Sequence, residues 1–204
     1  MKQNKTVFGT LFVTVTILLI LTACAKPYHF YVKYDSPGSS SVLKGQKVYL
    51  QVLDGRESKI FLSEKASSEF DMWDGSFALY DTPEKPKGEI QTYPLTGLVE
   101  AAMLKRLQSM GIELVEEKMN DVPLFEVTLN KLFLDLDDRT WVTDFSYEVK
   151  LTQGKQKTGR EKVSGQAERT KVMGRGAGEI LIGDIFTESI NKLNIEKLFE
   201  NAGL

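Results

Sequence analysis

The sequence predicts an α+β fold, a two-layer sandwich in which a mixed sheet of about five strands carries two helices on one face. Long stretches after residue 120 alternate apolar and polar residues, as strands with one buried face do. Two other stretches, residues 95–110 and 179–193, repeat apolar residues at helical spacing. The length left after the first 23 residues suits one globular domain, which we expect over residues 47–204, and the chain shows no internal repeat at solenoid periods.

The first 24 residues have the pattern of an export signal. Two lysines precede an apolar run over residues 7–21, and the tetrapeptide Leu-Thr-Ala-Cys stands at residues 21–24. This tetrapeptide resembles the lipobox of bacterial lipoproteins, in which a Leu stands three residues before the modified Cys. The resemblance implies that Cys24 receives a diacylglycerol, that the signal peptide 1–23 is removed, and that the new amine is acylated with a fatty acid such as palmitate. The alternatives are an uncleaved transmembrane anchor and a cysteine of the core.

Residues 24–46 are predicted to form a lipidated tether between membrane and domain. The first part of this segment is aromatic (27–34), and the second (36–41) is rich in Ser, Pro and Gly and flexible by composition. The alternative for the aromatic part is an edge strand packed on the domain. Ala25 follows the cysteine, where lipoproteins that stay at the inner membrane of Gram-negative hosts commonly have Asp. In such a host we expect anchoring at the periplasmic face of the outer membrane.

The composition excludes several classes of site and partner. The chain has 26 basic and 28 acidic residues, and this near balance argues against nucleic acid as a partner. Cys24 is the one cysteine and His29 the one histidine, so the chain offers neither an internal disulfide nor a cluster of metal-binding thiolates or imidazoles. We therefore expect no metal site and no cofactor.

The domain begins with a clear strand and a weaker one. Residues 47–54 alternate as a strand, and Asp54-Gly55 has the turn chemistry that stops it. Residues 60–66 are predicted to return as a second short strand.

A long irregular segment, residues 70–89, comes next. It is rich in turn residues and yet holds Trp73, Phe77 and Tyr80. Because loops of this length in compact domains are often functional, we hypothesise that these aromatic residues contact a partner or lipid. The alternative is that Trp73 packs on its own domain.

Residues 95–110 are the clearest predicted helix. Thr96 is a candidate cap, although Pro94 also permits a start one or two residues earlier, and Gly111 suits the position after the helix end. Residues 112–116 then form a strand. The order strand, helix, strand predicts that this strand lies parallel to the strand over residues 47–54.

Three long strands and a second helix complete the domain. The strand over residues 124–136 changes phase near Asn130-Lys131, which predicts a β-bulge. The strand over residues 141–151 alternates cleanly, and we expect its Phe145 to be buried opposite Leu107 of the first helix. The strand over residues 160–172 is polar, which places it near a sheet edge. The helix over residues 179–193 follows, and residues 195–201 add a last turn or two.

Two motifs that suggest chemistry have simpler interpretations. Gly174-x-Gly176-x-Gly178 fails the spacing of phosphate-binding loops, so we interpret it as a strand-to-helix joint. The acid-rich segment 135–139 lacks the Gly and downstream Glu of a calcium loop, so we interpret it as a tight turn. No His follows His29, and the acidic residues lie mostly in turns or on predicted solvent faces. We therefore expect a protein that is not an enzyme.

The strand over residues 48–56, which ends in Asp54-Gly55-Arg56, resembles the hydrophobic strand ending in Asp-x-Arg of the YajG-type bacterial lipoproteins. The order of the later elements is similar over about residues 48–198, although the aromatic tether and the 70–89 segment depart from that pattern. The layout also looks like that of auxiliary lipoproteins of envelope lipid-transport systems. The resemblance implies an envelope lipoprotein with no established enzymatic role. Asp54 and Arg56 either belong to a recognition site at the end of the strand, or they have structural roles. In the second case Asp54 forms the turn, and Arg56 pairs with a carboxylate or caps the C-terminus of a helix.

From these observations we expect a lipoprotein held in the membrane by Cys24, which acts as an accessory or scaffold to an envelope protein partner. The alternative function is a binding module for a lipid or glycan. Such a module would use a cleft between the sheet and the aromatic segment.

Overall fold

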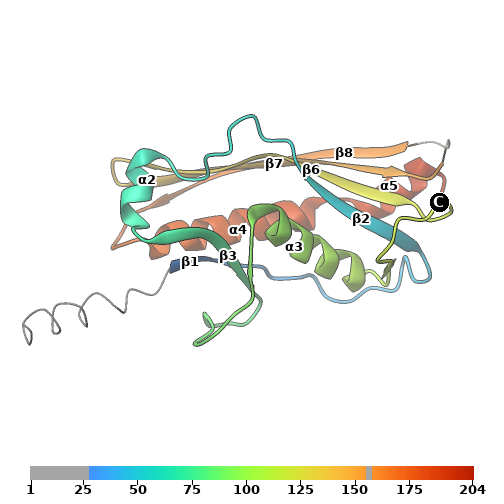
Figure 1. The fold of residues 1–204 in the computed structure, drawn as a ribbon, viewed down its shortest axis with the longest axis horizontal. Coiled ribbons are helices and arrows are strands. Elements are labelled where there is room, and N and C mark those ends of the chain that lie inside the picture. Colours follow the sequence, from blue (N-terminus) through green and yellow to red (C-terminus); the bar gives the residue numbers. More distant parts are fainter. Residues whose placement is uncertain (1–27, 155–157) are drawn as a thin grey trace, which may run out of the picture.

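The structure is a computed structural model that describes residues 28–154 and 158–204. The predicted signal peptide 1–23 and Cys24 lie outside these residues. The described chain is an α+β protein with two mixed sheets (Figure 1). The larger sheet has five strands in the order β5-β2-β6-β7-β8, and the smaller has three in the order β1-β3-β4. The sequence predicted a single sheet, so the smaller sheet is an addition to the expected fold.

The larger sheet contains β2 (Lys47–Asp54), β5 (Glu113–Leu114), β6 (Leu124–Asp137), β7 (Thr140–Thr152) and β8 (Thr158–Thr170). The smaller sheet contains β1 (Tyr28–Lys33), β3 (Trp73–Tyr80) and β4 (Thr92–Tyr93). The helices are α2 (Glu64–Glu69), α3 (Leu95–Ser109), α4 (Gly176–Lys192) and α5 (Ile195–Ala202).

The larger sheet follows the predicted strands closely. Buried side chains of β7, such as Trp141 and Tyr147, alternate with half-exposed polar ones, because one face of the sheet packs on helices and the other meets solvent. The predicted bulge is confirmed by a shift in the β6–β7 register between Leu129 and Lys131. β2 is parallel to β5, as predicted, and also to β6. β8 is an edge strand.

Helices cover the buried face of the larger sheet. α4 and α5 pack on β7 and β8, and α3 packs on β2. In Figure 1 these helices lie below the sheet. Phe145 and Leu107 are both buried, as predicted. The ring stacked on Phe145, however, is Phe186 of α4 at a centroid distance of 5.4 Å, so Phe145 packs on the second long helix rather than on that of Leu107.

The smaller sheet corrects two expectations. Residues 28–33, which the prediction assigned to the tether, form β1, and Phe30 and Val32 are fully buried. The segment 70–89, expected to be irregular, contains β3, which pairs with β1 in parallel. The sequence pattern does not reveal this strand, because it contains turn-forming residues such as Gly75, which has a φ of 84°. Its partner strand is also remote in the sequence. The edge-strand alternative therefore holds for residues 28–33, and the globular domain begins with them.

Residues 60–66 do not form the predicted strand. Leu62 makes one isolated bridge to Leu134, and α2 begins after Ser63. The Ser63 hydroxyl accepts a hydrogen bond from the Ala66 N–H at 3.1 Å, which caps the helix and fixes its start.

The turns and helix ends agree with the sequence patterns. Asp138 adopts a left-handed conformation in the turn between β6 and β7, and Gly111 does so after α3. α3 begins at Leu95 with Pro94 as its N-cap residue, the earlier of the two predicted starts. Within the described ranges, no helix combines the length and the apolar character that a membrane span requires.

Phe145→Ala removes a ring that is 1% exposed and stacked on Phe186. We expect the free energy of unfolding to fall by about 3–5 kcal/mol, because the surrounding core refills such a cavity only in part. Urea denaturation followed by circular dichroism measures the change. Glu148→Ala, on the solvent face of the same strand, is the control and should change the value by no more than about 0.5 kcal/mol. Equal losses for both variants would show that the inner face of β7 is misassigned.

Candidate functional site

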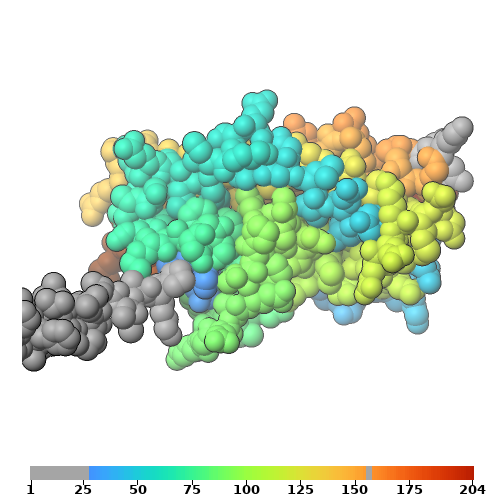
Figure 2. Space-filling view, in the orientation of Figure 1, coloured from blue at the N-terminus to red at the C-terminus, as the bar shows by residue number. Residues whose placement is uncertain are grey.

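A pocket of about 380 Å³ opens where β2 ends and α3 begins. Its walls come from the turn after β2, the segment before α2, β3 and the first turn of α3. The lining residues are Asp54, Arg56, Lys59, Phe61, Trp73, Gly75, Phe77, Pro94, Leu95 and Thr96. In Figure 2 the cyan-to-teal part of the chain, which includes β2 and β3, borders the green part that contains α3.

The pocket brings together most of the predicted site residues. Asp54 and Arg56, which carry the family likeness, line it, and so do Trp73 and Phe77 of the aromatic segment. Tyr80 is not among the lining residues. Its ring lies 6.5 Å from that of Tyr31, centroid to centroid, at the other end of β3.

Asp54 and Arg56 form a bidentate ion pair at the end of β2. Nε and Nη2 of Arg56 donate to Oδ1 and Oδ2 of Asp54, each at 3.0 Å, and Lys59 Nζ lies 3.1 Å from Oδ1. The hydrogen bonds from Arg56, supported by that from Lys59, hold the pKa of Asp54 well below its usual range against the opposing effect of burial. The Arg56 backbone N–H also donates to Oδ1, so the pair has the turn and carboxylate contacts of the structural interpretation.

Arg56 is buried although it is charged. Its side chain is 7% exposed, whereas that of Asp54 is 26% exposed. The pair uses one edge of the guanidinium, formed by Nε and Nη2. Nη1 is buried and has no hydrogen-bond partner among the described residues. A buried N–H without an acceptor is costly, so this second edge of Arg56 is a polar group that a ligand or water can satisfy.

Gly55 allows the chain between Asp54 and Arg56 to lie close against β6. Its N–H donates to the Leu129 carbonyl at 2.9 Å, which holds the turn against β6. A Cβ atom at this position would lie 2.6 Å from Cγ2 of Thr128. A larger residue would push the turn off β6 and displace Arg56 from the pocket wall.

Aromatic rings form the apolar wall of the pocket. Phe61 lies 5.3 Å from Trp73 and 5.0 Å from Phe77, measured between ring centroids. Trp73 Nε1 donates to the Ser76 carbonyl at 2.8 Å, so the indole has its polar group satisfied within its own strand. Phe30 of β1 contacts all three rings from the core side. Trp73 therefore packs on its own domain, as the alternative held, while it also lines the pocket.

The first turn of α3 forms the third wall. Pro94 is the N-cap residue, and no side chain among the described residues caps this end. The first intrahelical bond runs from the Leu98 N–H to the Pro94 carbonyl. The N–H groups of Leu95, Thr96 and Gly97 precede it and have no acceptor within the helix.

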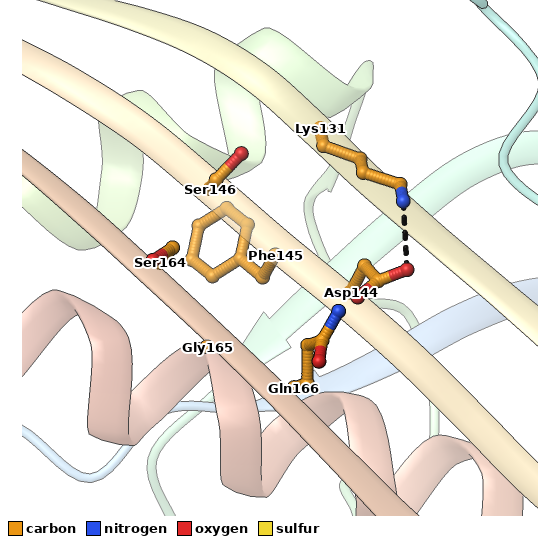
Figure 3. A pocket seen from close by; sticks show the side chains of 7 residues that line it. All are labelled: Lys131, Asp144, Phe145, Ser146, Ser164, Gly165 and Gln166. Carbon is orange, nitrogen blue, oxygen red and sulfur yellow. Dashed lines mark hydrogen bonds and ion pairs between the residues drawn. The ribbon is translucent and has the colours of Figure 1, made fainter.

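A second depression, of about 490 Å³, lies on the solvent face of the larger sheet (Figure 3). Lys131 extends across it to Asp144 Oδ2 at 2.7 Å, away from the hydroxyl of Ser146. Its cation is therefore already paired, and the depression lacks an apolar wall comparable to the three rings of the β2–α3 pocket. Among the described residues, no group of three or more His, Cys, Asp or Glu side chains could hold a metal ion.

Sequence reasoning missed three parts of the β2–α3 pocket. Lys59 and Phe61 stand three and five residues after Arg56, in a segment whose course after Gly55 has no periodic pattern. The sequence indicates a helix start near Pro94 but does not indicate that it forms a pocket wall. The missing cap at Pro94 is the sequence signal that could have indicated an available helix N-terminus.

Comparisons with known proteins identify no family for this chain. No family model matches it, and no curated protein matches it in sequence. Among solved structures, the crystal structure of protein XCC0632 from Xanthomonas campestris, described by the family model DUF330, is similar with a TM-score of 0.46 and 11% sequence identity. The similarity covers 85% of this chain and 96% of that chain.

The charge of Asp54 should make a pH-dependent contribution to stability. Because its native pKa is depressed below the unfolded value of about 3.9, this contribution is complete above roughly pH 5 and is lost as the pH falls toward the native pKa. We expect Asp54→Asn to lower the free energy of unfolding by about 2–3 kcal/mol at pH 7. The difference from the wild type should shrink below about pH 4.

Urea denaturation at several pH values from 7 to 3 measures this difference. Asp144→Asn is the control, since it breaks an ion pair whose Lys131 side chain is 54% exposed, and should cost less than about 1 kcal/mol. A difference between Asp54→Asn and the wild type that stays constant across this pH range would contradict the prediction.

Proposed function

We propose that this protein is a lipid-anchored lipoprotein of the bacterial envelope, attached through Cys24 and acting as a non-catalytic accessory or scaffold to an envelope protein. The observation that carries the proposal is the place of the sole cysteine. It ends the predicted export signal, and β1 of the globular domain begins four residues later, at Tyr28. Four residues span at most about 14 Å, so a lipid on Cys24 would hold the domain directly at the bilayer.

Aromatic and charged side chains contact one another at the end of the domain where β1 begins. Glu179 of α4 accepts hydrogen bonds from the Tyr28 hydroxyl and, at 3.0 Å, from the Tyr31 N–H. The Arg175 guanidinium lies 3.6 Å from the centroid of the Tyr28 ring, and Lys85 Nζ lies at the same distance from that of Tyr31. These contacts fix β1 on α4, so a pull on the anchor would be transmitted to the whole domain.

Apolar side chains are exposed at the same end. Val172 and Met173, in the connection from β8 to α4, are each 87% exposed. Met72 is 54% exposed, and its carbonyl accepts the Tyr28 N–H. A bilayer surface beside the anchor would cover apolar side chains that are exposed at this end of the domain. Their position supports contact between this end of the domain and the lipid headgroup region.

The likeness to YajG-type lipoproteins and to auxiliary lipoproteins of lipid-transport systems supports the accessory role. The absence of Asp after Cys24 supports the outer membrane as the site of anchoring in a Gram-negative host. A second candidate function is a binding module for a lipid or glycan. The observation that favours it is the β2–α3 pocket, which is lined by the aromatic wall and by Arg56, whose Nη1 has no hydrogen-bond partner among the described residues.

Lipidation is tested by Cys24→Ala in cells fed with labelled palmitate. We expect the wild type to incorporate the label and to have the mass of a chain that starts at Cys24. The variant should stay unlabelled and uncleaved, because the thiol that receives the diacylglycerol is missing. Label in the variant, or a mature chain that starts elsewhere, would overturn the anchoring proposal.

Contact with the bilayer is tested by tryptophan quenching in the full-length lipoprotein, reconstituted in vesicles. We expect Met173→Trp to be quenched by brominated phosphatidylcholine, because the new indole would lie at the headgroup level. Ile60→Trp, at a residue that is 63% exposed in the loop after β2, is the matched control and should add no quenched signal. Equal quenching of the two variants would exclude a defined membrane-facing end.

A further inference from the structure

We propose that the β2–α3 pocket binds the phosphate group of an anionic amphiphile, with the apolar part of the ligand on the wall formed by Phe61, Trp73 and Phe77. The proposal deepens the binding function suggested for this pocket and is independent of lipidation at Cys24.

The charges around the pocket leave one positive charge unmatched. Asp54 accepts hydrogen bonds from Arg56 and also lies 3.1 Å from Lys59 Nζ, so two cations share one carboxylate. Lys59 is 59% exposed on its side chain and can therefore turn toward a ligand without breaking the Asp54–Arg56 pair. An anion that enters this pocket would complete the neutralisation.

Arg56 supplies the geometric part of the recognition. Its Nε and Nη2 atoms are engaged by Asp54, which fixes the guanidinium plane. The Nη1 atom has no hydrogen-bond partner among the described residues, although only 7% of the side chain is exposed. Guanidinium edges match the oxygen spacing of phosphates and carboxylates, so an oxyanion is the ligand type that this edge suits.

The start of α3 adds backbone donors. This helix is 15 residues long, and no side chain of the described residues caps its N-terminus. The uncapped N–H groups carry a partial positive charge of roughly half a unit, which favours an anion near the first turn. Arg56, Lys59 and the first turn of α3 line one pocket, so these backbone donors add to the one positive charge that Asp54 leaves unmatched.

The aromatic wall and the size of the pocket determine which group attached to the phosphate would fit. A volume of about 380 Å³ is at the small end of the range typical for ligand pockets and exceeds what a bare phosphate needs. Phe61, Trp73 and Phe77 would lie beside the group that carries the phosphate, and rings of this kind favour an acyl or glyceryl part over water. A lipid headgroup and a free phosphate share the anion chemistry, and the apolar wall favours the lipid.

Trp73 provides the readout, because it lines the pocket while Trp141 is fully buried in the core. Full-length protein in a non-ionic detergent is titrated with inorganic phosphate, glycerol 3-phosphate, dihexanoyl-phosphatidate and uncharged dihexanoylglycerol. We expect a saturable fluorescence change with the phosphate compounds, tightest for the phosphatidate. Equal affinity for inorganic phosphate would support the anion site and assign it to free phosphate. Saturation by the uncharged lipid alone, or by none of the four, would overturn the proposal.

Three variants separate the contributions. Lys59→Gln should weaken phosphatidate binding roughly five-fold, and Arg56→Lys, which keeps the charge and loses the planar fork, about ten-fold. Lys162→Gln removes the same charge from the exposed face of β8 and is the matched control. Circular dichroism confirms that each variant is folded, and Trp73→Phe should abolish the fluorescence change. If Lys59→Gln and Lys162→Gln bind the phosphatidate equally well, the pocket is not the anion site. Intact mass reports acylation of the same samples, so failure of this site leaves the anchoring proposal standing.

Discussion

Close packing of α4 against both sheets is the constraint on which the rest of the fold depends. Two glycines permit it. A Cβ atom on Gly183 would lie 3.3 Å from backbone atoms of Lys33 in β1, and one on Gly178 would lie 3.2 Å from the Trp141 ring in β7. Because α4 comes so near, its Thr187 accepts the Asp35 N–H and donates to the Lys33 carbonyl. The helix thus satisfies the edge of β1 that lacks a strand neighbour and joins it to the larger sheet.

This arrangement explains how the β2–α3 pocket obtains its shape. β1 is held by α4, β3 pairs with β1, and Phe30 of β1 supports the rings of Trp73 and Phe77. On the opposite side, Gly55 lets the turn after β2 lie close against β6, and this turn positions Arg56 in the pocket wall. The aromatic wall therefore draws on both sheets: Trp73 and Phe77 belong to β3, whereas the Phe61 carbonyl accepts the Leu134 N–H of β6 at 2.8 Å.

The sequence was most informative where a strand has one buried and one solvated face. β6, β7 and β8 show that alternation, and even the bulge beside Lys131 is visible as a change of phase. β1 and β3 were not recognised as a pair, because their aromatic runs lack a clean period and their pairing joins segments that are distant in the chain. Asp54, Arg56, Trp73 and Phe77 were singled out on two unrelated grounds. Only the parallel pairing of β1 with β3 and the packing of α3 place them around one pocket, which no local pattern contains.

The length of the β6–β7 hairpin has a consequence for how an anchored domain would present itself. Its strands have 14 and 13 residues, so the hairpin extends over about 45 Å at 3.3 Å per residue. The turn of this hairpin meets the connection before α4, where the Lys171 N–H donates to the Arg139 carbonyl at 2.7 Å. That connection leads to Arg175 and so to Tyr28, the first residue of β1. If the domain is anchored as proposed, the hairpin would act as a rigid spacer, with one end near the lipid and the other end holding a bound protein at a set distance from it.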